Sequence, residues 1–344
     1  MKKFFCIILF VIVFSTVSFA GVDVPEYIRV KLSDGTIEEV ELDTYLYSVV
    51  QSEMGVSYKA SGMSKSEAVP IDALKAQAVA SRSYAVYNIN KAGEDAEFHV
   101  TASTSSQVYN HNANINANVK KAVDETSGQV ITYDDEVACA YFFSTSGGQT
   151  ESSENVWYSE VPYLKAVEDK YEIEVDNKSS WTAVYSISDI ENKFPEIGDF
   201  KSIKILEYSD NDRVIELKIK GTDGSKILTK NSIRTALGAT KLKSQWFDVE
   251  VDEDEIIFTG RGYGHGVGMS QNGAIGMALN GFSYDEILKW YYTDIEILGI
   301  ENSRNDINKY PEQHIEIDKR EKERPLLNKL VNACSTNWLL EGLK

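Results

Sequence analysis

A glycine-rich stretch around His265 is the part of the chain whose residue types most clearly suggest a binding loop. Five glycines occur within nine residues around this histidine, and the polar residues Ser270 and Gln271 follow them. Glycine is needed where φ is positive or where another group approaches the main chain closely. Apolar runs at residues 256–258 and 274–279 predict a strand–loop–helix junction, whose backbone N–H groups could hold a polar ligand. A tight loop in which His265 only packs is the alternative.

Glu53 is placed where a general acid could act. Asp43 is expected to cap a helix with one apolar face, and Glu53 lies at the carboxyl end of that helix. The helix dipole is negative at this end, so it disfavours the ionised carboxylate and raises its pKa. Because the chain has 53 acidic residues, a simply solvated Glu53 is the alternative.

A second helix is expected to start at Pro70 and to carry two basic residues, Lys75 and Arg82. They are seven positions apart and therefore share one helix face. Several alanines in the same helix favour close packing against neighbouring elements. Both a solvated edge and a cationic stripe over a polar substrate are consistent with this spacing.

Composition excludes some classes of protein. The 344 residues are 42% hydrophobic, which is ample for a core, and the net charge is -18. Nucleic-acid binding requires clustered Lys and Arg, so this class is not expected. Binding of another anionic polymer would have to rely on a local basic group.

The amino terminus predicts export. Lys2 and Lys3 precede an uncharged run at residues 4–17, and small residues before Gly21 resemble a signal-peptidase site. Residues 1–20 are therefore expected to be a signal peptide, with an uncleaved membrane anchor as the alternative. We expect Cys139 and Cys334 to be unpaired, because nothing marks them as a pair.

The order of elements predicts an α+β fold, with mixed helices and antiparallel strands around a substrate groove. A β-hairpin is expected at residues 27–42, and a strand at 137–143. A small β-rich subdomain is expected at 170–250, and Ser283 should open a late helix through a capping box. Residues 302–344 are expected to be a polar linker and an amphipathic tail outside the main domain.

Residues 45–54, 73–84 and 262–271 together resemble the hallmark segments of the stage II sporulation protein D (SpoIID/LytB) family. The last of them reads Gly-Tyr-Gly-His-Gly-Val-Gly-Met-Ser-Gln, and residues 146–150 and 162–165 resemble two lesser segments. The similarity covers roughly residues 27–299. It implies an exported bacterial cell-wall protein that acts on peptidoglycan glycan strands. The sporulation members are lytic transglycosylases, although the same domain also serves other wall processes.

The resemblance also implies roles for particular residues. Glu53 takes the position of the catalytic acid/base, Lys75 and Arg82 fall on the substrate side, and Tyr163 and Lys165 match a polar pair. From the residues themselves, His265, Ser270 and Gln271 could hold sugar hydroxyls. A lytic transglycosylase needs only one carboxyl group, whereas glycoside hydrolases need two.

Two alternatives and several departures accompany this interpretation. A non-catalytic wall-binding module that stimulates an N-acetylmuramoyl-L-alanine amidase is the second hypothesis, and a metal hydrolase using His265 ranks last. Some members bind a metal through Cys and His near the position of Cys139. Residues 143–145 here contain no histidine, so we expect no metal and no cofactor. Gly55 stands where the family often has proline, and the loop before residue 73 is longer than usual.

Overall fold

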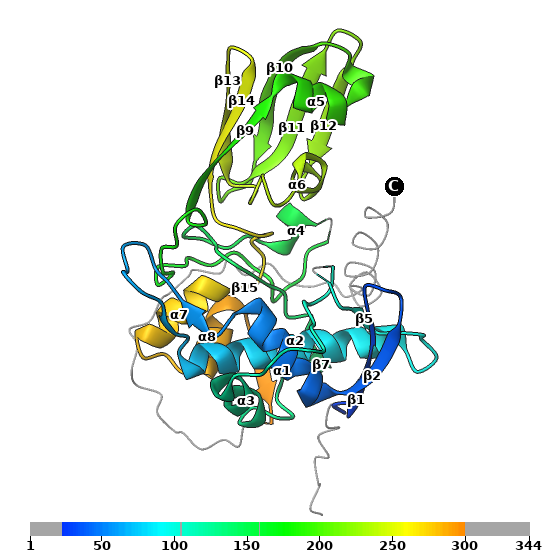
Figure 1. The fold of residues 1–344 in the computed structure, drawn as a ribbon, viewed down its shortest axis with the longest axis vertical. Helices are drawn as coiled ribbons and strands as arrows, with labels where there is room; N and C mark the ends of the chain where they lie inside the picture. The colour runs from blue at the N-terminus through cyan, green and yellow to red at the C-terminus, as the bar shows by residue number, and fades with distance from the viewer. Residues whose placement is uncertain (1–22, 104, 158, 300–344) are drawn as a thin grey trace, which may run out of the picture.

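The computed structural model describes residues 23–103, 105–157 and 159–299, and these form a mixed α+β fold (Figure 1). The expected signal peptide or anchor at residues 1–20 and the expected tail at 302–344 lie outside the described residues. Within the described part of the chain, no helix combines the length and the hydropathy needed to cross a membrane.

The longer helices pack around one central helix. The helix α2 (Ile71–Ala92) contacts four others, which are α1 (Leu42–Glu53), α3 (Ala117–Asp124), α7 (Gln271–Leu279) and α8 (Tyr284–Tyr291). Twelve residues of α2 are buried, because the alanine-rich sequence lets its neighbours approach on several sides. A large apolar core surrounds this helix.

Short strands complete the helical part. The β1–β2 hairpin is antiparallel, and β5 joins β1 in parallel. The strand β6 pairs with β7 and β16, β3 pairs with β4, and β8 pairs in parallel with β15. The bounds are β1 Tyr27–Lys31, β2 Ile37–Glu41, β3 Ser57–Tyr58, β4 Glu67–Ala68, β5 Val100–Thr101, β6 Val130–Tyr133, β7 Glu136–Val137, β8 Phe142–Phe143, β15 Met269–Ser270 and β16 Glu296–Leu298, with the short helix α4 at Ser153–Val156.

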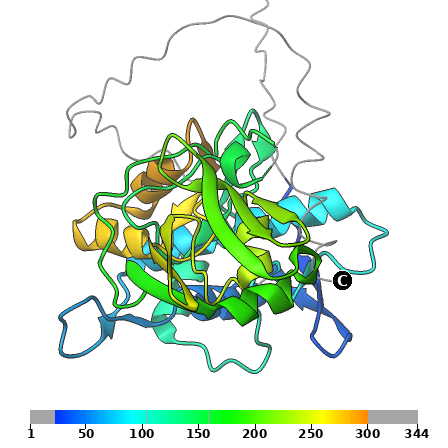
Figure 2. The same cartoon turned by 90° about the horizontal axis from the view of Figure 1, so that it is seen from above.

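A β-rich unit with its own apolar core stands on the helical part (Figures 1 and 2). Its two three-stranded antiparallel sheets have the strand orders β10–β11–β12 and β13–β14–β9. Its elements are β9 Ser180–Ser186, α5 Ile187–Lys193, the 3-10 helix Pro195–Ile197, β10 Phe200–Tyr208, β11 Val214–Gly221, β12 Ser225–Thr229, α6 Ser232–Leu237, β13 Phe247–Asp252 and β14 Glu255–Arg261. This unit begins and ends later in the chain than the range 170–250 expected from sequence.

Several local expectations can be compared directly with these elements. The hairpin at 27–42 is confirmed, and so is the capping box at Ser283. Asp43 does not cap α1, because Glu41 is the N-cap residue and the Asp43 side chain is bonded to other elements. The single strand expected at 137–143 is wrong, because its ends, β7 and β8, pair with strands of two different sheets.

The glycine-rich stretch connects the two parts of the molecule. It follows β14, forms β15 beside β8 and leads into α7, which is the expected strand–loop–helix order. Gly262, Gly264, Gly266 and Gly268 all have positive φ. A side chain at Gly268 would overlap the carbonyl oxygen of Tyr141. The glycines therefore permit close packing of the loop against β8.

The contact of α7 with residues 171–173 gives the first prediction. Ala normally stabilises a helix relative to Gly, by about 1 kcal/mol. A Cβ at Gly276 would overlap the Tyr171 carbonyl, so Gly276→Ala should instead destabilise the fold by about 1–3 kcal/mol. Urea unfolding measures this. Ala278→Gly in the same helix is the control and should lower the stability by about 1 kcal/mol, which is the difference in helix propensity between Ala and Gly. A Gly276→Ala variant as stable as wild type would contradict the close packing of α7 against residues 171–173.

Candidate active site around Glu53

Glu53 is partly buried and its carboxyl is held by two neighbouring groups. Its Oε1 accepts a hydrogen bond from the backbone N–H of Val108 at 2.7 Å, and the Gln271 amide also hydrogen-bonds to the carboxyl. Burial raises the pKa of Glu53 above its usual value of 4.5, and these two hydrogen bonds oppose the rise. The direction agrees with the expectation from sequence, but the main cause is desolvation.

A ring of neutral polar side chains lies beside this carboxyl. The Gln271 amide donates to Gln77 Oε1 at 3.3 Å, and Gln77 donates to the Ser81 hydroxyl at 3.0 Å. Gln107 donates to the Ser81 carbonyl oxygen at 3.3 Å and accepts from the Tyr45 hydroxyl at 3.0 Å. Of the residues predicted for the site, the structure brings Glu53 and Gln271 together. Gln77 and Gln107 were missed, since no local pattern marks a buried amide.

His265 lies in the interior of the glycine-rich loop. Its Nδ1 accepts from the Val267 N–H at 3.1 Å, so Nε2 carries the proton and donates to the Phe142 carbonyl oxygen at 3.1 Å. Burial first, and then the positive charge of Arg234, lowers its pKa to about 3. The ring is therefore neutral and both nitrogens are used within the protein. This geometry favours the alternative in which His265 only packs within the protein, and it does not favour a role in sugar binding.

Ser270 is also buried, and its hydroxyl forms hydrogen bonds with other groups of the protein. Its hydroxyl accepts from the Gly273 N–H at 3.1 Å as the N-cap of α7, and it donates to Glu172 Oε1 at 2.8 Å. These contacts leave its expected contact with sugar hydroxyls without support. The cap instead fixes the start of α7, where Gln271 is the first helical residue.

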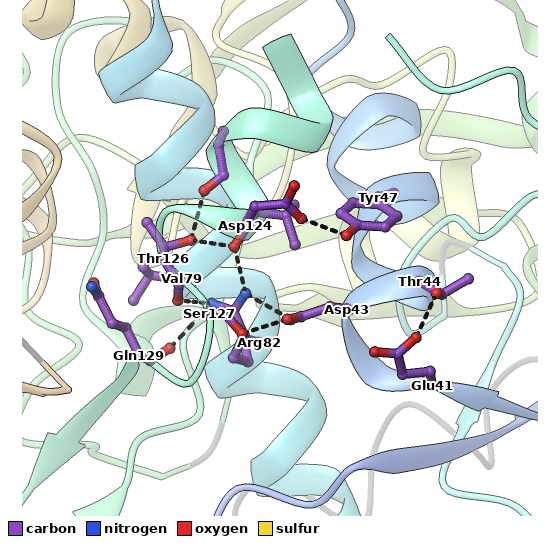
Figure 3. A network of polar contacts seen from close by, with 12 residues as sticks. Glu41, Asp43, Thr44, Tyr47, Val79, Arg82, Asp124, Thr126, Ser127 and Gln129 are labelled. Atoms are coloured by element: carbon purple, nitrogen blue, oxygen red, sulfur yellow. Dashed lines mark hydrogen bonds and ion pairs between the residues drawn. The ribbon is translucent and has the colours of Figure 1, made fainter. Parts of the chain in front are cut away.

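The basic residues of α2 are paired within the protein (Figure 3 shows the Arg82 network). Arg82 is fully buried and binds Asp43 Oδ1 at 3.0 Å, and it also donates to main-chain carbonyl groups at residues 123–129. Lys75 forms an ion pair of 2.6 Å with the more exposed Glu125. The sequence placed both residues on one face correctly, but α3 and α1 cover that face. Arg82 therefore lies in the interior of the protein and not on the substrate side that was expected.

Tyr163 and Lys165 lie in a different group of contacts. The Tyr163 hydroxyl accepts from the Cys139 N–H at 2.9 Å, and Lys165 forms ion pairs with Glu154 and Glu160. None of the contacts described for Glu53 involves either residue. Cys139 is buried. The expectation that it is not paired with Cys334 concerns a residue outside the described part of the chain.

A pair of acids beside the loop at 146–148 gave no signal in the sequence. Asp169 is buried, and burial together with the negative charge of Glu172 raises its pKa to about 7. Glu172 accepts hydrogen bonds from the backbone of Ser146 and Gly147 as well as from Ser270. The pair lines an open pocket of about 390 Å³ together with residues of 174–180.

Among residues 23–299 as described, no group of three or more His, Cys, Asp or Glu could hold a metal ion.

The chain is similar to known proteins over most of its length. A family model described as Stage II sporulation protein matches residues 33–133, and one described as a domain of unknown function matches 181–268. Stage II sporulation protein D of Bacillus subtilis is 32% identical over 298 residues, which is 82% of this chain and 80% of the relative. The amidase enhancer of Bacillus subtilis is 32% identical over 295 residues, 72% of this chain and 39% of the relative. An uncharacterized protein of Brachyspira hyodysenteriae is 34% identical over 266 residues, 76% and 68% of the two chains.

The placement of the two basic residues gives the second prediction. Arg82→Met removes a buried charge, its ion pair with Asp43 and its hydrogen bonds to several carbonyl groups, so it should destabilise the fold by about 3 kcal/mol or more. Lys75→Met removes a more exposed ion pair and should cost less than about 1 kcal/mol. Chemical denaturation of both variants compares these values. Equal stability of the two variants would contradict a structural role of Arg82.

Proposed function

The chain belongs to the stage II sporulation protein D family, and from this premise we propose that it is a cell-wall lytic transglycosylase. Its substrate is the glycan strand of peptidoglycan, and its product carries a 1,6-anhydro-muramic acid end. We also propose export to the wall through residues 1–20, as a signal peptide or a membrane tether. A role in sporulation is carried over from the names of the relatives and belongs to the same proposal.

Glu53 is the residue that performs both proton transfers in this mechanism. The protonated carboxyl donates its proton to the glycosidic oxygen as the bond to C1 breaks. The resulting carboxylate accepts the proton of the C6 hydroxyl of the same muramic acid, and that oxygen bonds to C1. The proton taken up in the second step restores the acid, so no water and no second carboxylate take part. The Val108 N–H and the Gln271 amide stabilise the carboxylate between the two steps.

The observation that carries this proposal is a single, partly buried carboxyl whose pKa is raised by burial. An acid that remains protonated at higher pH than an ordinary glutamate is suited to protonate a leaving group. The contacts that the structure describes for Glu53 involve an N–H group and an amide, and include no other carboxyl group. A hydrolase would place a second carboxyl about 5–10 Å away across the scissile bond.

A second candidate function is supported by one of the relatives. The protein named amidase enhancer is 32% identical to this chain, although the chain spans 39% of its length. In this function the domain binds wall glycan without cleaving it and stimulates a separate N-acetylmuramoyl-L-alanine amidase. The burial of Arg82 and the internal hydrogen bonds of His265 are compatible with it, since neither residue presents its charge or ring nitrogens to a ligand.

Product analysis separates the two functions. Purified peptidoglycan, with and without stem peptides, should release 1,6-anhydro-muramyl fragments that mass spectrometry detects. Glu53→Gln should reduce their release at least about 100-fold, because it removes the proton donor. Glu250→Gln, at an exposed acid of the β-rich unit, is the control and should retain the wild-type rate. If the wild-type protein releases no such fragments but binds the wall and accelerates a purified amidase, the second function stands.

The pH dependence of cleavage follows from the raised pKa of Glu53. The reaction begins with the protonated acid, so the rate should fall as pH rises through the pKa of this group. Because burial raises that pKa, the fall should occur at higher pH than for an ordinary glutamate. Initial rates of fragment release across the pH range measure this limb. A rate that already falls at the usual pKa of glutamate would contradict the assignment.

A further inference from the structure

We propose that Gln77 and Gln271 are positioning residues, which direct one amide N–H at the Glu53 carboxyl and hold this carboxyl in one orientation. This inference rests on the proposed role of Glu53, but it concerns contacts that form without substrate. Gln271 contacts Glu53, whereas Gln77 acts through Gln271. Neither residue transfers a proton.

The orientation of each amide is set by the group beyond it. Gln77 Nε2 donates to the Ser81 hydroxyl at 3.0 Å, and the carbonyl oxygen of the same amide therefore lies towards Gln271. That oxygen accepts one hydrogen of Gln271 Nε2 at 3.3 Å. An amide nitrogen has two hydrogens, and the second is then available to the carboxyl of Glu53. A reversed Gln77 would place its N–H against the Gln271 N–H and break this chain.

A second arm starts at the same residue and reaches the same carboxyl. The Ser81 carbonyl oxygen accepts from Gln107 Nε2 at 3.3 Å, which turns Gln107 Oε1 towards the hydroxyl of Tyr45 at 3.0 Å. The next residue is Val108, whose N–H donates to Glu53 Oε1 at 2.7 Å. Ser81 therefore anchors both donors of Glu53, one through two side-chain amides and the other through the backbone after Gln107.

Burial keeps this pattern of hydrogen bonds in one form. Gln77 is 0% exposed and Gln271 is 8% exposed, so water cannot readily replace a lost partner. Burying a glutamine in an alanine-rich helix costs more than burying an apolar side chain unless every polar atom is bonded. Among the ring residues, Tyr45 lies near three other ionisable groups, which are Tyr84, Glu53 and Tyr109. Burial raises the pKa of Tyr45 well above its usual value, so its hydroxyl remains a donor at neutral pH.

The test is the titration of the Glu53 carboxyl by carbon NMR in the full-length protein, with Glu53→Gln used to assign the signal. Gln271→Met keeps the size of the side chain but removes the donor, so the Glu53 pKa should rise above the wild-type value. Gln77→Met does not touch Glu53 and should nevertheless raise the same pKa. Both variants should lower the rate of fragment release about 10- to 100-fold through misplacement of the acid.

Gln245→Met is the matched control, because Gln245 is a buried glutamine of the β-rich unit that donates to the Val214 carbonyl oxygen. It should leave the Glu53 pKa and the rate at wild-type values. If Gln77→Met does not fold, Ser81→Ala removes the hydroxyl that orients Gln77 and must raise the pKa instead. An unchanged pKa in a folded Gln77→Met or Ser81→Ala variant overturns the inference. A wild-type protein that releases no fragments overturns the proposed function, while the titration still decides this inference.

Discussion

The burial of α2 is the constraint on which the arrangement of the site depends. Its buried polar residues, which include Gln77, Ser81 and Arg82, have little access to water, so neighbouring elements must satisfy them. Arg82 does so by binding Asp43 in the first turn of α1, and the chain from Gln77 reaches Glu53 at the last turn of α1. One buried helix therefore fixes α1 at both of its ends. The position of Glu53 is therefore fixed by the hydrogen bonds of its carboxyl and also by the anchoring of α1.

The glycine-rich stretch serves mainly to position other groups. Side chains at Gly264 and Gly266 would meet Phe143 and Arg213, so glycine lets the loop pass between β8 and the β-rich unit. The buried Arg213 binds the carbonyl oxygens of Ser146 and Gln149 and contributes to keeping His265 neutral. The loop ends at Ser270, the N-cap of α7, and this places Gln271 beside Glu53 of α1.

Local patterns in the sequence were sufficient for part of this arrangement. The hairpin, the capping box at Ser283 and the strand–loop–helix junction depend on residues close together in the chain, and each could be predicted. The placement of Glu53 at a helix end also followed from local periodicity. Helical spacing placed Arg82 on a face but could not show that α1 and α3 cover it. The contacts of Ser270 with Glu172 and of Gln271 with Gln77 join residues 98 and 194 positions apart, and no local pattern encodes such pairs.

The basic residues that were expected to bind substrate are paired within the protein. Lys75 binds Glu125, Arg82 binds Asp43, and Lys165 binds two glutamates, so these cations are not the free basic stripe that an anionic ligand would need. The groups that surround Glu53 are amides, a backbone N–H and phenols, which suit neutral hydroxyl and acetamido groups. Under the proposed function, an acidic chain with such a site would recognise a glycan through its neutral backbone. The orientation of a few amides would then matter more than net charge for how the acid meets its substrate.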